Sequence, residues 1–244
     1  MSTKRSLLFL LNKCGIFISR NPIISSEQFA TKLENQFIKK SRGILHIGAH
    51  LGQEGDRYFQ SRTKVIWIEA IPSVYEELRK NISGFQNQEA LCALLGDENN
   101  VILDFNLASN SLASSSIFNF GNNLGFKNLQ MHSKISLQMT RLDSIYTAET
   151  IADYEHWVID VQGAELLVLK GAGNLLANCK SLLVEVSTRQ VYDGGALWHE
   201  LENFLIANEL IPLWQPEDES HENVLFIRTP SNINEYPHNH SDKT

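Results

Sequence analysis

The chain has 244 residues, 43% of them hydrophobic, and its 21 basic and 28 acidic residues give a formal net charge of −7. This length and composition can bury one sizeable α/β core. An acidic chain without a dense run of Lys and Arg argues against nucleic acid and anionic membrane as partners.

The N-terminal region and the cysteines indicate where the protein works. Three cysteines, at 14, 92 and 179, are odd in number and lack CxxC spacing, which argues against a disulfide framework and a structural zinc site. The apolar stretch 6–18 contains Asn12 and Lys13 and is too short to span a bilayer. We expect residues 1–42 to be a helical extension, without stable membrane insertion, of a cytoplasmic protein, and a homo-oligomer is compatible with this composition.

Alternation of strands and helices begins at Gly43. Residues 44–47 and 64–69 read as strands, and each is followed by a helix, at 52–60 and 72–81. This β-α-β-α order predicts a parallel sheet with crossover helices, so a single domain is expected over residues 43–228.

The same alternation continues to the C-terminus. Further strands are expected near 90–95, 101–107, 136–139, 156–161 and 182–186, and helices over 164–177 and 196–208. Residues 211–214 and 223–227 are expected to pair as a closing antiparallel hairpin. The polar tail 229–244 is expected to be disordered.

The stretch 44–53, ILHIGAHLGQ, ends a strand in two glycines, Gly48 and Gly52, just before a helix. Glycines let the backbone approach a ligand closely, and a helix N-terminus offers free N–H groups. The spacing G-x-x-x-G differs from the G-x-G-x-x-G that holds a dinucleotide pyrophosphate. For this loop alone, a nucleotide site and a tight structural turn carry equal weight.

Glu69 ends the next strand, in the stretch VIWIE. In nucleotide-binding α/β units an acid at this position, about 20 residues after the glycine loop, accepts hydrogen bonds from the ribose hydroxyls. A carboxylate suits this role because it can accept from two hydroxyls at once. A solvated acid at a strand end is the alternative, but the loop and Glu69 together favour a nucleoside cofactor.

The stretch 158–173, VIDVQGAELLVLKGAG, is an apolar strand that runs into Asp160, Gln162 and Glu165 as a helix begins. These side chains would lie at the carboxyl end of a central strand, where open α/β sheets bind ligands. Burial there would raise the pKa of a carboxylate, as suits a general base or a metal ligand. A helix cap for Asp160 and a favourable helix dipole for Glu165 are the structural alternatives.

These stretches, with TRLDSI and LLVEVS, resemble in order and spacing the FkbM-type methyltransferases, a branch of the class I enzymes that use S-adenosylmethionine (SAM). The resemblance covers residues 43–228, and IDVQGAE is its most specific part. It implies a Rossmann-like, seven-stranded, mostly parallel sheet with helices on both faces and an antiparallel last strand. It also implies methyl transfer to a hydroxyl oxygen, often of a sugar or natural product.

The resemblance also implies which residues bind the cofactor. Glu69 would hold the ribose, the glycine loop would line the methionine end, and Asp160 would lie nearest the methyl group. The implied cofactor-binding residues are His46, Gly48, His50, Gly52, Glu69, Ala70, Ile71, Cys92, Ala93 and Asp160. His46 stands where the family usually has an acid, so it either contacts the cofactor ammonium or is a core histidine.

Methyl transfer to a hydroxyl needs a group that takes the proton. Asp160 is the first candidate, His132 the second, and a divalent ion held by Asp160 with Glu165 or Glu185 a third that the sequence does not support by itself. The acceptor, a small molecule or glycan, is expected to contact Ser115, Ser116, Gln162 and Glu165. The loop SNSLASSS offers hydroxyls without charge, which suits a polyhydroxylated acceptor, although a solvated linker is the plain alternative.

Two rival functions remain open from the sequence. A nicotinamide-dependent oxidoreductase would share the fold, but the G-x-G-x-x-G spacing is absent. A catalytically degenerate SAM-binding or scaffold protein is the second rival, and His46 in place of an acid is the feature that favours it.

Overall fold

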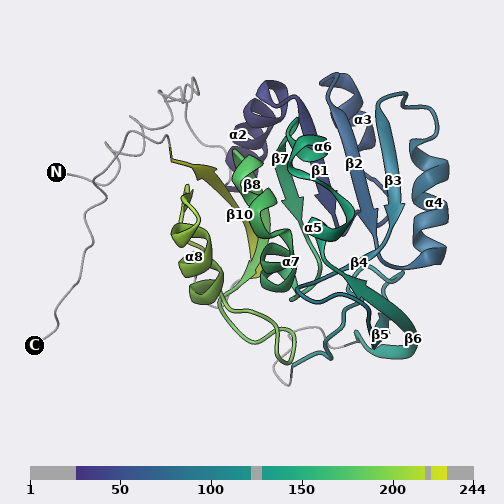
Figure 1. The fold of residues 1–244 in the computed structure, drawn as a ribbon. Helices are drawn as coiled ribbons and strands as arrows, with labels where there is room; N and C mark the ends of the chain where they lie inside the picture. The colour runs from purple at the N-terminus through teal and green to yellow at the C-terminus, as the bar shows by residue number, and fades with distance from the viewer. Residues whose placement is uncertain (1–25, 122–127, 218–220, 230–244) are drawn as a thin grey trace, which may run out of the picture.

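The computed structural model describes residues 26–121, 128–217 and 221–229 (Figure 1). The expected N-terminal helix over 6–18 and the expected disordered tail after Thr229 lie outside these residues. Within the part of the chain that is described, no helix has both the length and the apolar character needed to cross a membrane.

The centre of the molecule is a seven-stranded sheet in the order β3-β2-β1-β7-β8-β10-β9. Its strands are β1 (Gly43–Ile47), β2 (Lys64–Glu69), β3 (Gln88–Cys92), β7 (Tyr154–Ile159), β8 (Ser181–Ser187), β9 (Leu210–Pro212) and β10 (His221–Arg228). The pairs from β3 to β8 are parallel, whereas β10 runs antiparallel to both β8 and β9. The expected Rossmann-like sheet with a reversed last strand is confirmed, as is the closing hairpin.

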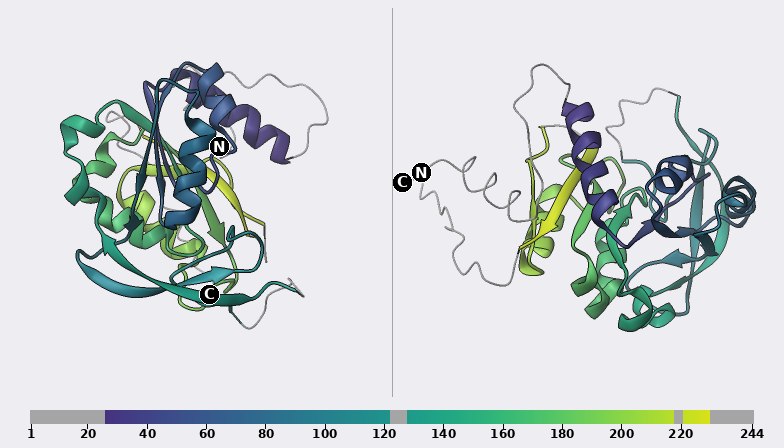
Figure 2. Two further views of the ribbon diagram at one scale, coloured as in Figure 1. Left: turned by 90° about the vertical axis from the view of Figure 1, so that its right-hand side faces the viewer. Right: turned by 90° about the horizontal axis from the view of Figure 1, so that it is seen from above.

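Helices cover both faces of this sheet, which Figure 2 shows nearly edge-on in its left view. One face carries α2 (Ser26–Lys40), α3 (Gly55–Gln60) and α4 (Pro72–Ile82). The other carries α5 (Leu142–Ile145), α6 (Ala148–Ile151), α7 (Glu165–Ala172), the 3₁₀ helix η1 (Gly173–Asn178) and α8 (Trp198–Ala207). The central strands β1, β2 and β7 are buried on both sides, which explains the apolar runs 65–68 of β2 and 157–159 of β7.

A second, three-stranded sheet lies across the carboxyl ends of the large one, below its arrowheads in Figure 1. It contains β4 (Leu94–Leu95), β5 (Val101–Ala108) and β6 (Met131–Thr140), in the order β4-β6-β5. The single strand expected over 90–95 is therefore wrong, because the chain leaves the large sheet after Cys92 and joins the small one at Leu94. This turn places the small sheet over the edge where parallel strands end.

The helix expected over 164–177 is shorter than predicted. α7 ends at Ala172, where Gly173 takes a φ of 50°, and the chain continues as the 3₁₀ helix η1. With a ψ of −132°, Gly173 lies outside the left-handed helical region, in a backbone conformation that is essentially restricted to glycine. The 3₁₀ helix η1 then leads the chain back into β8.

Within the extension expected before β1, the structure describes the helix α2 and the short link from it to β1. Leu33 and Phe37 of α2 are buried against β9 and β10, as their spacing predicts. Both Glu34 oxygens accept hydrogen bonds from Arg57 of α3, at 2.9 Å each. The Glu34 side chain is only 5% exposed, and its ion pair with Arg57 holds α2 against α3. The apolar contacts of Leu33 and Phe37 hold α2 against the sheet.

Candidate active site

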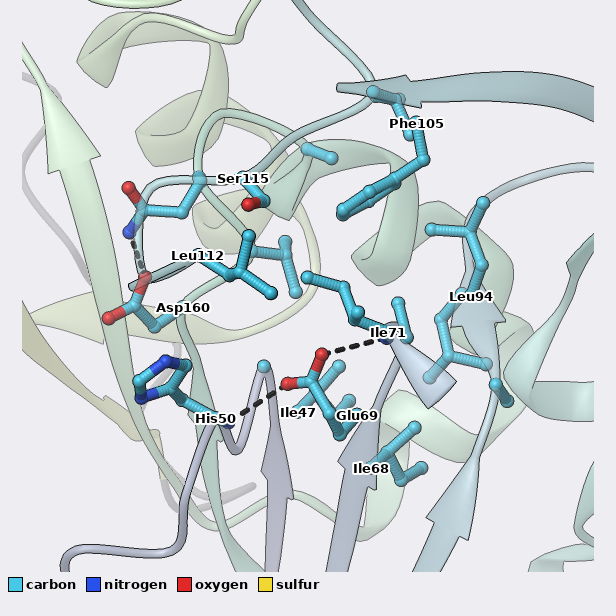
Figure 3. Close-up of a pocket in the computed structure, with 18 of the residues that line it drawn as sticks. Ile47, His50, Ile68, Glu69, Ile71, Leu94, Phe105, Leu112, Ser115 and Asp160 are labelled. Carbon is cyan, nitrogen blue, oxygen red and sulfur yellow. Dashed lines mark hydrogen bonds between the residues drawn. The ribbon is translucent and has the colours of Figure 1, made fainter. Parts of the chain in front are cut away.

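The carboxyl ends of β1, β2 and β7 open into a pocket that the small sheet and the loop after β5 cover (Figure 3). In the sheet, β1 has β2 as its neighbour on one side and β7 on the other, so the strand order reverses direction at β1. Open α/β sheets bind ligands at such a switch point. The lining residues include Gly48, His50, Glu69, Ala70, Ile71, Ala93, Leu94, Phe105, Leu112, Ser115, Asp160 and Gln162.

Glu69 at the tip of β2 is held rigidly in this pocket. One of its oxygens accepts from the backbone N–H of Ile71 at 2.8 Å and the other from that of His50 at 2.9 Å (Figure 3). Burial raises the pKa of Glu69, although these two hydrogen bonds act in the opposite direction. Each oxygen keeps a further lone pair, so the carboxylate can accept from two neighbouring hydroxyls of a ligand.

Of the two loop glycines, Gly48 shapes the pocket. Its φ is 82°, and a Cβ there would lie 1.7 Å from the Asp160 carbonyl oxygen, so any side chain would collide with the end of β7. The Asp160 N–H in turn donates to the Ile47 carbonyl at 3.0 Å. Gly52 serves packing instead, since its Cβ would lie 2.6 Å from Leu78 of α4.

The loop after β5 forms the roof of the pocket. Leu112 points into it in Figure 3, and Leu112 and Ser111 both take a positive φ, of 68° and 57°. A ring nitrogen of His50 lies 3.0 Å from the Ser111 carbonyl, which ties the roof to the glycine loop. The loop is therefore a built part of the pocket, in contrast to the solvated linker that its polar composition allowed.

Beside the pocket, the Gln162 side chain joins two carboxylates. Its Nε2 donates to Asp160 and, at 2.8 Å, to Glu185 of β8, while its Oε1 accepts from the Tyr192 hydroxyl. Glu185 also lies 3.1 Å from Nε2 of His221 at the start of β10, and Nδ1 of that ring lies 2.6 Å from the Ser187 hydroxyl. Residues from the strands β8 and β10 and from the loops after β7 and β8 thus share one polar network.

Three carboxylates meet in this network, because oxygens of Asp160, Glu165 and Glu185 lie within 4.8 Å of one another. Burial raises the pKa of Asp160 well above its ordinary range, and the charge of Glu185 raises it further. Burial also raises the pKa of Glu165 to about 7. Since protein donors already bond to all three groups, we treat the cluster as a hydrogen-bonded network and assign no metal to it.

The structure brings nine of the sequence-predicted residues to the pocket, namely Gly48, His50, Glu69, Ala70, Ile71, Ala93, Ser115, Asp160 and Gln162. The others do not line it: Glu165 accepts from the backbone N–H groups of Val161 and Gly163, Ser116 is buried and donates to the Gln162 carbonyl, and the Cys92 thiol faces the Ala70 carbonyl. His132, the second base candidate, is exposed on β6 and outside the pocket. Contacts of all these residues with a ligand stay predictions.

His46 lies in the core, on the face of β1 that α2 and α3 cover. It is 5% exposed, its Nδ1 is 3.2 Å from the Tyr58 hydroxyl, and its ring stacks on Trp67 with centroids 4.8 Å apart. Burial lowers its pKa to about 4, so the ring is neutral at pH 7. The position that set this chain apart from its family pattern therefore contributes to packing, and it does not line the pocket.

Sequence reasoning missed His221 and the apolar roof formed by Leu112 and Phe105. His221 follows Asp160 only after an entire further α/β segment, and antiparallel insertion of β10 beside β8 brings the two together. No spacing rule connects such residues. Leu112, the one large apolar residue in SNSLASSS, was the available signal for the roof.

Comparison with known proteins places the chain in context. A family model described as the methyltransferase FkbM domain matches residues 46–211. No curated protein sequence matches significantly.

Several solved structures are similar in fold. An uncharacterized protein of Listeria monocytogenes has a TM-score of 0.48 at 11% identity, over 88% of this chain and 72% of that one. Fibrillarin of Aeropyrum pernix with bound SAM has a TM-score of 0.45 at 13% identity, over 80% and 74% of the chains. An O-methyltransferase of Bacillus cereus in complex with S-adenosylhomocysteine (SAH) scores 0.45 at 13% identity, over 93% and 91%.

Replacing Gly48 should disrupt the meeting of β1 and β7. Gly48→Ala is expected to lower the free energy of unfolding by about 2 kcal/mol or more, because the new Cβ meets the Asp160 backbone and the φ is positive. Urea denaturation measures this. The control is Gly84→Ala, where a Cβ meets nothing within 4 Å and the change should be within about 1 kcal/mol. Equal effects of the two substitutions would contradict the role of Gly48.

The pKa of His46 predicts a pH-dependent contribution to stability. Folding lowers the pKa of His46 from its ordinary 6.5 to about 4. As the pH drops, this histidine is therefore protonated in the unfolded chain before it is protonated in the folded protein. The contribution of the neutral His46 to the free energy of unfolding is complete above pH 6.5. It falls by about 3 kcal/mol between pH 6.5 and 4. The difference in unfolding free energy between wild type and His46→Gln should follow this course in urea titrations at each pH. A difference that stays constant over this range would refute a buried, neutral His46.

Proposed function

The chain belongs to the FkbM methyltransferase family, and on that basis we propose that it transfers the methyl group of SAM to a hydroxyl oxygen of a sugar or natural-product-like small molecule. The observation that carries the proposal is the position of Glu69 and Gly48 at adjacent strand tips of one pocket. Glu69 offers oriented acceptors for ribose hydroxyls, and Gly48, which has no Cβ, lets its loop approach the end of β7 so that Asp160 lines the same pocket.

The pocket fits the parts of such a cofactor. Ala70, Ile71, Ala93, Leu94 and Phe105 give an apolar wall next to Glu69, which suits a flat heterocycle beside its ribose. Asp160 lies on the other side of Gly48, where a negative side chain would attract a sulfonium. The cofactor would supply an electrophilic methyl carbon at this end of the pocket.

The contribution of this chain to the reaction is then positioning and proton transfer. Roof and strand tips exclude water and hold the acceptor oxygen close to the methyl carbon, which is the main requirement of an in-line displacement. Asp160 takes the proton of the acceptor hydroxyl, and its raised pKa makes it a stronger base than an exposed aspartate. Ser115 and Gln162, both in the lining, offer uncharged hydrogen bonds to a small polyhydroxylated acceptor in the cytoplasm.

The position of His46 bears on the rival scaffold function. The replacement of the usual acid by His46 was its support, but that side chain packs against Tyr58 and Trp67 and leaves the pocket lining unchanged. The acids that do line the pocket, Glu69 and Asp160, are both present.

Removing the acceptor function of Glu69 should weaken cofactor binding. In calorimetry with SAH, Glu69→Gln is expected to raise Kd by about 10- to 100-fold, because an amide replaces one charged hydrogen-bond acceptor with a donor. Glu76→Gln, on the exposed surface of α4, is the matched control and should bind as wild type does. Failure of wild type to bind SAH would end the proposal, whereas equal binding by Glu69→Gln would remove only the ribose assignment.

Loss of the base should slow methyl transfer far more than it weakens SAM binding. Asp160→Asn is expected to lower kcat by about 10²- to 10⁴-fold. The assay uses methyl-labelled SAM and the first acceptor that a panel of hydroxylated sugars and natural products yields. Unchanged kcat would refute Asp160 as the base. Cofactor binding without methylation of any panel member would favour the scaffold function.

A further inference from the structure

A row of polar contacts leads away from Asp160 on the side opposite the cofactor pocket. Gln162 bonds to both Asp160 and Glu185, Glu185 contacts His221 at 3.1 Å, and His221 contacts Ser187 at 2.6 Å. The His221 side chain is 19% exposed and that of Glu185 14% exposed. The row therefore joins a base in the pocket to an imidazole that solvent can reach.

The Glu185 carboxylate lies close to that of Asp160, and its negative charge adds to burial in raising the pKa of Asp160. The ionisable groups that face Asp160 are Glu185 of β8, Glu165 of α7, His221 of β10, Tyr192 of the loop after β8, and His50 and Glu69 of the pocket. Among them only the histidines can be positive, and His50 bonds to Gln53 and the Ser111 carbonyl. His221, by contrast, contacts a member of the acidic pair directly, at Glu185.

The same contacts determine how readily His221 is protonated. Burial alone would lower its pKa, but the hydrogen bond from its ring to Glu185 and the charges of Glu185, Glu165 and Asp160 raise it overall. A protonated His221 beside Glu185 neutralises that carboxylate. Its positive charge then lets the neighbouring Asp160 lose its proton at a lower pH than it otherwise would.

We propose that Glu185 and His221 are positioning residues of the methyl-transfer site, which act through Gln162 on Asp160 and set the pH at which that base becomes available. The inference rests on the proposed function, because it takes Asp160 as the group beside the reacting methyl. Glu185 keeps a like charge close to the base, and His221 limits the effect of that charge. Together, these two residues leave Asp160 a stronger base than an exposed aspartate, yet one that still loses its proton.

The test needs no knowledge of the acceptor. SAM and SAH share the adenosine, the carboxylate and the amino group, and differ in the methyl group and the positive charge on sulfur. The ratio of their dissociation constants, Kd of SAH over Kd of SAM, therefore reports the negative charge beside the sulfur. Calorimetry from pH 5 to 9 should show this ratio rise by about tenfold, with one midpoint, as Asp160 ionises.

Two variants should move that midpoint in opposite directions. His221→Gln keeps a side chain that can donate to Glu185 but removes the positive charge, so the midpoint should rise by about one pH unit or more. Glu185→Gln removes the like charge next to Asp160, so the midpoint should fall by a similar amount. Asp160→Asn should give a ratio that stays flat. A merely structural role would weaken both ligands together and leave the midpoint in place.

The matched control is Glu222→Gln, one residue after His221 on the same strand, whose carboxylate accepts from the Glu217 backbone instead. It should leave the midpoint unchanged. The inference is overturned, while SAM and SAH still bind, if the wild-type ratio does not change with pH. It is also overturned if the two variants move the midpoint in the same direction or leave it in place. If His221→Gln fails to fold, the direction of Glu185→Gln decides. Absence of binding of either ligand to wild type overturns the proposed function itself.

Discussion

The architecture of the pocket depends on how closely the ends of β1 and β7 approach each other. A Cβ at Gly48 would lie 1.7 Å from the Asp160 carbonyl, and the Asp160 N–H bonds to Ile47 just before that glycine. This contact fixes the loop after β1 and the loop after β7 as one unit. Glu69, held by the His50 N–H of the same loop, then takes its place on the other side.

From this contact the site extends in two directions. Toward β2 and β3 it is apolar apart from Glu69, and toward β8 and β10 it is acidic, with Gln162 placed between Asp160 and Glu185. An amide suits that position because its two N–H groups can bond to two carboxylates while its oxygen accepts from Tyr192. This division of the pocket fits the proposed function, in which one side would bind the nucleoside and the other would supply the base.

The sequence predicted most of the fold because its central strands are buried on both faces and are therefore rich in apolar residues, as in the run 65–68 of β2. It failed where an element depends on contacts distant along the chain. The strand expected over 90–95 divides between two sheets, since Leu94 pairs with Met139 of β6, and the helix after Ala164 ends early where Gly173 turns. In the site, His46 comes just before the glycine loop, yet the alternation of β1 turns its ring toward Tyr58 and Trp67.

The sequence by itself determined the parallel sheet, the closing antiparallel hairpin, the glycine loop, and the two acids, Glu69 and Asp160, that line the pocket. It could do so because apolar runs and strand-end residues are local features, and parallel strands bring their ends to one edge. Only the tertiary structure decided that Gly52 packs on α4, that His132 lies outside the pocket, and that His221 reaches Glu185. Those outcomes depend on which strand inserts beside which, and antiparallel β10 between β8 and β9 brings together residues that no spacing in the chain relates.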